Sequence, residues 1–249
     1  MTDPTEDRTT PQWRGIAFNV MFYAWTVLLL PIGAVACAIS PPAVWAVSRV
    51  WSRGALLLLA VLVGLRHRTR GREHIPDGPV MFAVKHQSAW ETVAINLFVR
   101  NPVFVVKQEL TRIPLFGLML RRSGMIPVDR AGGASTLRTM LLAARARVAE
   151  GRSVVIFPEG TRTPVGERHP YHPGVAALYT ALDIPVVPVA LNSGLFWPRR
   201  SLRLAAGTIT FEFLPPIEPG LKRRDFARRL ETAIEEATEA LVADARNLS

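Results

Sequence analysis

The hydrophobic residues divide the chain into an apolar N-terminal part and a longer part in which short apolar runs alternate with amphipathic segments. No Asp, Glu, Lys or Arg occurs between Gly15 and Ser48. As a helix, residues 16–39 would be about 36 Å long, which is enough to cross the hydrocarbon core of a bilayer. The Ser-Pro-Pro sequence at 40–42 then ends this helix.

A second apolar stretch, residues 43–65, contains Arg49 and Arg53, which share one helical face. A guanidinium in mid-bilayer is costly, so this helix is expected to lie along the interface or to enter only partway. The following "RHRTRGR" places four arginines where cytoplasmic headgroups would attract them. The pattern predicts a disordered tail over residues 1–15 and a membrane-associated helical pair over 16–72. Two core helices of a soluble protein are the alternative.

From Glu73 onward the pattern is α/β. Apolar runs bounded by turn residues predict strands at 80–84, 103–107, 124–128, 153–157 and 186–191. Helical patterns lie between them at 89–98, 114–122, 135–149 and 175–182. This alternation predicts a mostly parallel twisted sheet flanked by helices, with ligands at the carboxyl ends of the strands.

Two further elements follow at the C-terminal end. Residues 208–214 alternate strictly and place Ile209, Phe211 and Phe213 on one side of a strand. Residues 223–243 repeat apolar residues at helical spacing, which predicts an amphipathic helix packed on the sheet. Residues 73–249 would therefore form one domain.

The charge balance favours an anionic partner. The net charge is +10, and only three of the 30 cations are lysines. No RNA-binding sheet texture, zinc-finger spacing or basic zipper occurs, so lipid is favoured over nucleic acid. The single cysteine, Cys37, cannot form an intrachain disulfide and suits a reducing compartment.

The stretch "KHQSAWET" at 85–92 has two interpretations. Ser88 and Glu91 have the spacing of a capping box, in which Glu91 only stabilises a helix start. Alternatively, the carboxylate of Glu91 reaches the ring of His86, fixes its tautomer and leaves the other ring nitrogen as a general base. The two interpretations are compatible.

Three other predicted strands each end in a cation. "VFVVK" ends at Lys107, "SGMIPVDR" at Arg130, and "VVIFPEGTRT" carries Arg162 just beyond its end. In a parallel sheet these side chains reach the same edge as His86. Three cations beside a histidine–carboxylate pair suit a phosphate monoester. Any one of them alone could be a solvated surface residue.

The motifs "HQSAWE", "GMIPVDR", "FPEGTR" and "IPVVPVAL", in this order, resemble those of the bacterial 1-acylglycerol-3-phosphate O-acyltransferases and the wider glycerolipid acyltransferase superfamily. The resemblance covers residues 75–215 and identifies 73–249 as an acyltransferase domain. It implies transfer of a fatty acyl group from acyl-CoA or acyl-ACP to the sn-2 hydroxyl of 1-acyl-glycerol-3-phosphate, giving phosphatidic acid. No cofactor besides this co-substrate is implied.

The resemblance also implies residue roles. His86 would be the catalytic base and Glu91 would orient it; Arg130, Glu159, Gly160, Thr161 and Arg162 would form the acceptor-binding motifs, to which the strand-end pattern adds Lys107. Most members have Asp at the position of Glu91 and often Asn at that of Lys85. Since neighbours on a strand alternate, the Lys85 side chain is expected to point away from the base.

The expected partners are a lysophospholipid acceptor, the acyl donor and anionic membrane lipids, without nucleic acid. The expected location is the cell inner membrane, with the catalytic domain on the cytoplasmic face. No metal site is expected at His169 and His172, because Pro170 and Pro173 preclude a helical ligand face. The alternatives are an acyltransferase for another lyso-lipid such as lyso-ornithine lipid, a membrane-anchored phosphohydrolase, or a non-catalytic protein that binds anionic lipid.

Overall fold

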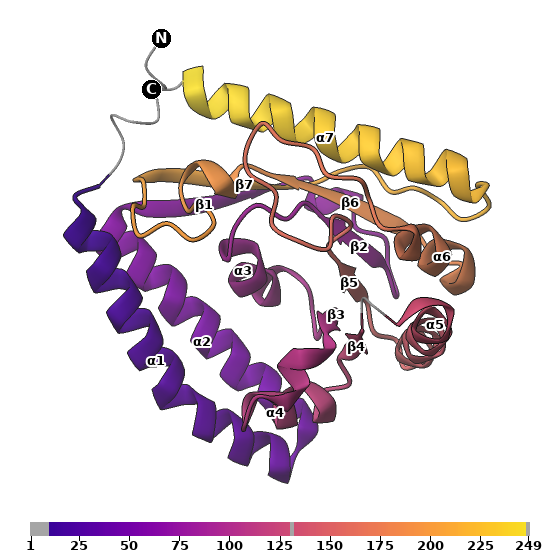
Figure 1. The fold of residues 1–249 in the computed structure, drawn as a ribbon, viewed down its shortest axis with the longest axis horizontal. Coiled ribbons are helices and arrows are strands. Elements are labelled where there is room, and N and C mark those ends of the chain that lie inside the picture. Colours follow the sequence, from indigo (N-terminus) through magenta and orange to yellow (C-terminus); the bar gives the residue numbers. More distant parts are fainter. Residues whose placement is uncertain (1–9, 130–131, 248–249) are drawn as a thin grey trace.

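The computed structural model describes residues 10–129 and 132–247, and within them a seven-stranded sheet is flanked by helices (Figure 1). The strands are β1 (Leu65–Arg70), β2 (Met81–Val84), β3 (Val103–Lys107), β4 (Ile126–Val128), β5 (Val154–Ile156), β6 (Val186–Leu191) and β7 (Gly207–Phe213). The α-helices are α1 (Gln12–Ile39), α2 (Val44–Leu58), α3 (Trp90–Phe98), α4 (Phe116–Arg122), α5 (Gly133–Ala149), α6 (Pro173–Leu182) and α7 (Arg223–Asn247). Short helical turns are η2 (Pro41–Ala43), η3 (Leu59–Val63), η4 (Arg72–His74), η5 (Gln108–Arg112) and η6 (Ser193–Leu195).

The sheet has the order β1-β7-β6-β2-β5-β3-β4 and is mostly parallel. Strands β2 to β6 run in one direction, whereas β7 is antiparallel to β6 and carries β1 parallel to itself at the sheet edge. The predicted α/β fold is confirmed. The carboxyl ends of β2, β3, β5 and β6 meet at one edge, which is where a site is expected.

Each face of the sheet has its own hydrophobic core, and β2 contributes to both. Met81 and Ala83 pack with residues of α5, α6 and α7, whereas Phe82 and Val84 pack with residues of α2 and α3. This alternation continues into the segment after β2, because successive side chains of an extended chain point to opposite faces.

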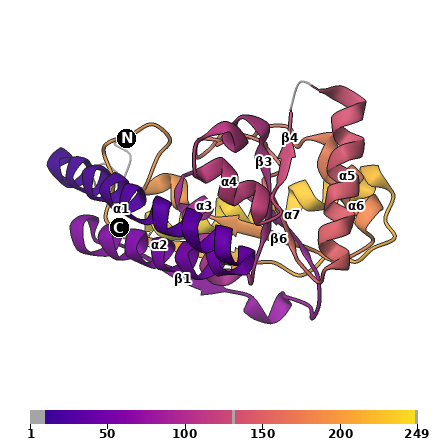
Figure 2. The ribbon, with the colours of Figure 1, turned by 90° about the horizontal axis from the view of Figure 1, so that it is seen from below.

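Helices α1 and α2 form a hairpin that lies along one side of the sheet, away from α5 and α6 (Figures 1 and 2). The η3 turn extends α2 in a π-helical conformation up to β1. The indole nitrogen of Trp25 donates to the Trp51 carbonyl at 3.1 Å, and that of Trp51 donates to the Thr26 hydroxyl at 2.9 Å. Gly54 permits this close approach, because a Cβ there would lie 2.4 Å from Trp25 Nε1.

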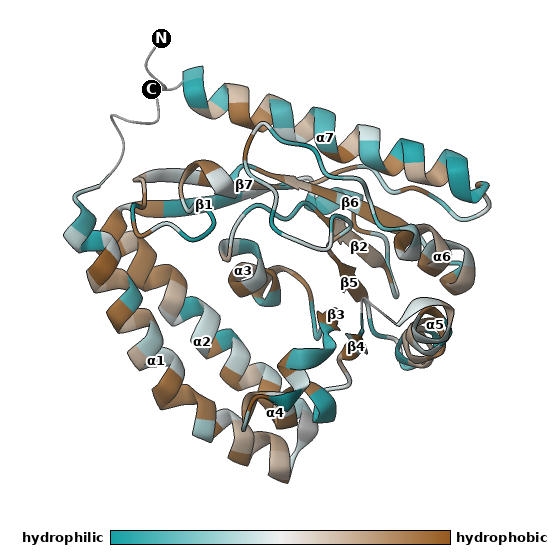
Figure 3. Cartoon of the chain, in the orientation of Figure 1, coloured by the Kyte–Doolittle hydropathy of each residue, from teal (hydrophilic) through white to brown (hydrophobic). Residues whose placement is uncertain are grey.

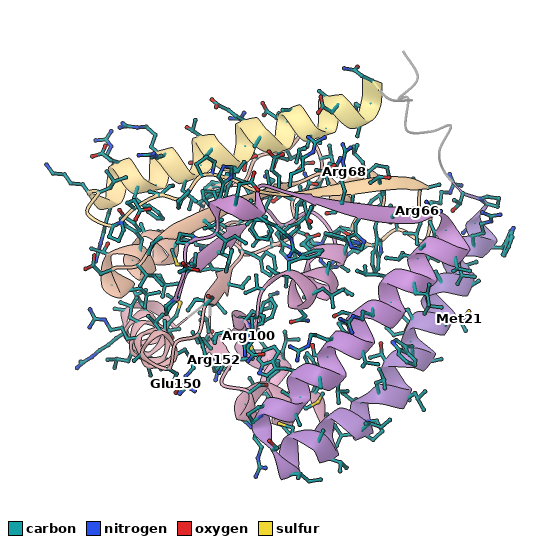
Figure 4. The ribbon with its side chains drawn as sticks, turned by 180° about the vertical axis from the view of Figure 1, so that it is seen from behind. Met21, Arg66, Arg68, Arg100, Glu150 and Arg152 are labelled. Carbon is teal, nitrogen blue, oxygen red and sulfur yellow. The ribbon has the colours of Figure 1, made fainter. Side chains whose placement is uncertain are left out.

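The hairpin is mostly apolar (Figure 3), and many of its large apolar side chains are exposed. Large side chains such as Val27 and Ile39 are more than two-thirds exposed, and Met21 lies on the outer side of α1 (Figure 4). Both apolar helices, Gln12–Ile39 and Val44–Val63, are long enough to cross a membrane, and only 17% and 28% of their most apolar windows are buried. This exposure differs from that of core helices and suggests membrane association.

Two predicted boundaries need correction. Helix α1 begins at Gln12, and Thr10 already bonds to the Leu204 carbonyl, so residues 10–15 do not belong to a tail; residues 1–9 lie outside the described residues. The basic stretch after the hairpin forms strand β1, so the sheet begins at Leu65, before the predicted boundary at 72/73. Hydrophobic patterning did not predict this strand because most of its side chains are polar. Its backbone pairs with β7, and Arg66 and Arg68 lie at the edge of the sheet (Figure 4).

Candidate active site

His86 and Glu91 meet at the central strand of the sheet. His86 is the second residue after the end of β2, and His86 Nδ1 lies 2.8 Å from Glu91 Oε1. A carboxylate oxygen only accepts hydrogen bonds, so Nδ1 carries the ring hydrogen and Nε2 keeps a free lone pair. The Glu91 side chain is fully buried, whereas the His86 side chain is 14% exposed. The ring therefore has one nitrogen held from behind and the other available for chemistry.

Glu91 is fixed by three further donors. Its Oε1 accepts from the backbone N–H groups of Gln87 and Ser88, at 2.7 and 2.6 Å, and its Oε2 accepts from Ser193 Oγ at 2.8 Å. All partners donate, which compensates a buried carboxylate anion. Ser88 Oγ in turn accepts the N–H of Trp90 at 3.1 Å, so the capping box is present as well. Glu91 both caps α3 and orients the imidazole.

Lys85 points to the opposite face of the sheet, as predicted. Its ammonium lies 2.7 Å from Glu159 Oε1 and 2.7 Å from Glu235 Oε1 on α7, and its side chain is 1% exposed. The other oxygen of Glu159 accepts the backbone N–H of His86 at 2.8 Å. Glu159 is thus buried behind His86 and accepts a hydrogen bond from its backbone. The resemblance implied that Glu159 belongs to the acceptor-binding motifs, but its side chain does not line the cavity.

Tyr171 completes this buried group. Its hydroxyl donates to Glu235 Oε1 at 2.8 Å. Burial, followed by the negative charges of Glu235 and Glu159, raises the pKa of Tyr171, so the phenol stays neutral. One ammonium and two carboxylates give the group a net charge of −1, and they tie α7 to the turn after β5 and to the end of β2.

A cavity of about 570 Å³ lies beside the imidazole. Its polar end is lined by residues from three strand ends: His86, Lys107, Gly160, Thr161 and Arg162. Its apolar part is formed by α1, α2, β3 and α4, with Leu29, Trp51, Val105 and Met119 among its walls. Phe157 stacks on the His86 ring with 4.2 Å between centroids, which fixes the ring plane at the cavity surface.

The structure brings together His86, Lys107, Gly160, Thr161 and Arg162 in one cavity and places Glu91 and Glu159 behind it. Arg130 lies outside the described residues. Among the residues described, no Asp or Glu lines the cavity, whereas Arg199 and Arg200 do. Four cations, Lys107, Arg162, Arg199 and Arg200, thus line this cavity, and their charge favours an anionic ligand.

Sequence reasoning missed Ser193, Arg199 and Arg200. Ser193 is 102 residues from Glu91 in the chain. All three follow β6, which is parallel to β2 and hydrogen-bonded to it. The strand-end rule that selected Lys107 and Arg162 would have found this segment had it been applied to β6.

His172 is exposed and His169 is partly exposed, and neither lines this cavity. His169 Nε2 lies 3.6 Å from Glu167 Oε2. Within residues 10–129 and 132–247, no group of three or more His, Cys, Asp and Glu side chains is arranged to hold a metal ion.

A mostly parallel sheet, an apolar hairpin and a histidine–carboxylate pair at the mouth of an apolar cavity together define an α/β transferase of the glycerolipid acyltransferase class. The family model described as "Acyltransferase" matches residues 66–192, and the chain belongs to this acyltransferase family.

Individual relatives agree with this assignment. A 1-acyl-sn-glycerol-3-phosphate acyltransferase of Pseudomonas aeruginosa is 37% identical over 64% of this chain and 62% of its own length, so the match spans less than two thirds of that relative. The human 1-acyl-sn-glycerol-3-phosphate acyltransferase alpha is 27% identical over 80% of this chain and 71% of its own. The crystal structure of the LPA acyltransferase PlsC from Thermotoga maritima superposes with a TM-score of 0.74, covering 92% of this chain and 98% of that one, and at 20% identity it supports the fold.

Proposed function

We propose that this protein transfers a fatty acyl group from a thioester donor to the sn-2 hydroxyl of 1-acyl-glycerol-3-phosphate, giving phosphatidic acid. One observation carries the proposal: an oriented imidazole, several cations and an apolar cavity share a single site. The relatives from Pseudomonas and human bear the name of this activity. An anionic headgroup fits the cationic end, and an acyl chain fits the apolar part.

The chemistry follows from the tautomer of His86. Nε2 takes the proton of the acceptor hydroxyl as its oxygen attacks the thioester carbonyl carbon. Glu91 stabilises the imidazolium that forms, as its carboxylate keeps the hydrogen bond to Nδ1. The tetrahedral intermediate then collapses, the carbon–sulfur bond breaks, and the imidazolium returns the proton to the departing thiolate. No covalent acyl-enzyme is needed, because the thioester is already activated.

The donor is acyl-CoA or acyl-ACP, and the reaction needs no metal or other cofactor. The protein acts at the cytoplasmic face of the inner membrane, where the exposed face of the hairpin contacts lipid and the basic residues of β1 face anionic headgroups. A lysophospholipid then reaches the cavity from the membrane, because α1 and α2 form both the exposed apolar face and part of the cavity wall.

The test uses the purified full-length protein in detergent micelles. Acyl-CoA and acyl-ACP are each combined with 1-acyl-glycerol-3-phosphate and with lyso-ornithine lipid, and product is measured by mass spectrometry. We expect phosphatidic acid from at least one donor, and a loss of about 10³-fold or more in kcat for His86→Ala. His169→Ala, which removes a partly exposed histidine outside the cavity, is the matched control. A wild-type protein that acylates lyso-ornithine lipid but not 1-acyl-glycerol-3-phosphate contradicts the proposal. So does a His86→Ala variant with normal turnover.

A further inference from the structure

The segment after β6 brings two additional arginines to the cavity. Arg199 and Arg200 lie in the loop between η6 and β7, and both line the same cavity as His86 and Arg162. Neither belongs to the motifs that carry the family resemblance. Their guanidinium groups are in exposed positions at the polar end, where the described lining holds no carboxylate that would neutralise them.

The loop with these arginines rests on the turn after β5. Arg199 Nη1 donates to the Arg162 carbonyl at 3.4 Å. The next residue of that turn, Thr163, donates its backbone N–H to the His86 carbonyl at 2.8 Å. The Arg199 side chain is therefore hydrogen-bonded to the backbone of the turn that carries Arg162, and that turn is hydrogen-bonded to the backbone of His86.

The loop is held in place on both sides. Trp197 packs edge-on against Phe18 of α1, with 5.1 Å between ring centroids, and the Leu204 carbonyl accepts hydrogen bonds from Thr10. Arg200 has a φ of 58°, a left-handed conformation that is unfavourable for a residue other than glycine. Such strain persists where the surroundings fix the backbone, and it is found at ligand sites more often than elsewhere.

The charges suggest which ligand these arginines suit. A phosphate monoester carries about two negative charges and three strong acceptor oxygens, whereas a phosphodiester carries one charge. Arginine forks bind such oxygens in pairs. In 1-acyl-glycerol-3-phosphate only one carbon and one oxygen separate the carbon that bears the reacting hydroxyl from the phosphorus. When that hydroxyl contacts His86, the phosphate lies close by, within the cavity that Arg162 and Arg199 also line.

We propose that Arg199 and Arg200 close the headgroup site beside Arg162 and select acceptors that end in a phosphate monoester over phosphodiester and uncharged acceptors. This inference rests on the proposed function and adds to it the residues that determine acceptor specificity. The arginines bind the terminal phosphate of the acceptor and take no part in binding the acyl donor.

The test compares Arg199→Ala/Arg200→Ala with Arg203→Ala, which removes an exposed arginine of the same loop that does not line the cavity. For the double variant we expect the KM for 1-acyl-glycerol-3-phosphate to rise about 30-fold, as two charge-assisted contacts in a solvated position are lost. The KM for the donor should stay within about twofold, since uniform binding of one substrate is removed. Glycerol 3-phosphate, used as a soluble competitor, should inhibit the double variant about 30-fold more weakly.

Selectivity is the second readout. The ratio of kcat/KM for 1-acyl-glycerol-3-phosphate to that for lysophosphatidylglycerol, a phosphodiester acceptor, should fall about tenfold or more in the double variant and stay unchanged in Arg203→Ala. An unchanged ratio, or a KM that rises equally for both acceptors, overturns the inference. So does a defect that appears only as weaker binding to anionic vesicles, because the arginines would then serve the membrane surface. If the wild-type protein acylates no phosphate-bearing acceptor, the proposed function itself fails.

Discussion

Replacing Ser193 by alanine tests whether the carboxylate behind His86 must be held in one orientation. Ser193 Oγ donates to Glu91 Oε2 at 2.8 Å, and both side chains are fully buried. The substitution removes this donor and leaves the three donors to Glu91 Oε1 in place. The carboxylate can then rotate about its remaining contacts, so the imidazole is oriented less strictly.

The size of the effect follows from the type of bond that is lost. A hydrogen bond to a charged group contributes about 1.5–3 kcal/mol, and about 1.4 kcal/mol in the transition state corresponds to a tenfold change in rate. Since three donors to Glu91 remain, we expect the lower part of this range. The expected loss for Ser193→Ala is about 10- to 30-fold in kcat, with KM values for both substrates within about threefold.

The assay is steady-state acyl transfer in detergent with saturating donor, together with thermal unfolding of each variant. Ser52→Ala is the matched control, because Ser52 is also fully buried and its hydroxyl donates to the Val93 carbonyl of α3 at 2.7 Å. Both variants lose one buried hydrogen bond, which costs about 1 kcal/mol of stability for the neutral bond of Ser52 and about 1.5–3 kcal/mol for the bond of Ser193 to a carboxylate. Only Ser193→Ala should lose turnover.

A double-mutant cycle with Glu91→Gln identifies the route of the effect. If Ser193 acts through the carboxylate, then Ser193→Ala should change kcat by less than about twofold in the Glu91→Gln background. An equal loss in both backgrounds, or a Ser193→Ala variant as active as Ser52→Ala, would refute the reasoning.

Three further predictions concern stability. Lys85→Met leaves Glu159 and Glu235 buried without their cation and should cost about 3–5 kcal/mol in the free energy of unfolding. Gly54→Ala places a methyl group against the Trp25 ring and should cost about 1–3 kcal/mol, seen as a lower Tm in detergent. Because the pKa of Tyr171 is raised in the folded state, the folded protein keeps the phenol proton at high pH. The unfolded chain releases this proton above the ordinary pKa of 10.0, so the free energy of unfolding falls as the pH rises above that value. Tyr171→Phe should reduce that alkaline slope by up to about 1.4 kcal/mol per pH unit.

A control for Lys85→Met comes from α7. Glu239→Gln removes the exposed partner of Arg168, one turn beyond Glu235 on α7, and it should change stability far less than Lys85→Met does, because solvent screens an exposed ion pair. A Lys85→Met variant as stable as Glu239→Gln, or a Gly54→Ala variant with an unchanged Tm, would show that these contacts are not made as described.

Hydrophobic patterning predicted the sheet well where a strand is a continuous apolar run. The runs that became β3 and β6 were predicted with the bounds that the structure has, because a continuous apolar run between turn residues leaves few alternatives. Strand β1 was missed for the opposite reason. Five of its six residues are polar, and it is stabilised by backbone pairing with β7, which no local pattern reveals.

In the candidate site, too, local sequence predicted some contacts and missed those made by distant elements. His86 and Glu91 are five residues apart, so local spacing was sufficient to pair them. The contacts that complete the site come from distant elements: Ser193 and Arg199 reach it from the end of β6, and Glu235 reaches Lys85 from α7, 150 residues later. The sequence predicted that Lys85 points away from His86, but it did not indicate which carboxylates form ion pairs with its ammonium group.

The continuity of the hairpin with strand β1 affects how the protein can be handled. Gly64, with a φ of 76°, is the single residue between the η3 turn and β1, and the hairpin also supplies part of the cavity wall. A truncated version that starts at residue 73 would therefore lose more than two apolar helices: the sheet would lack its edge strand β1, and the cavity beside His86 would be open to water. We therefore expect a protein shortened in this way to be inactive. Polar substitutions at the exposed residues Val20, Val27 and Val35 of α1 would make the protein more soluble and leave the sheet and the cavity intact.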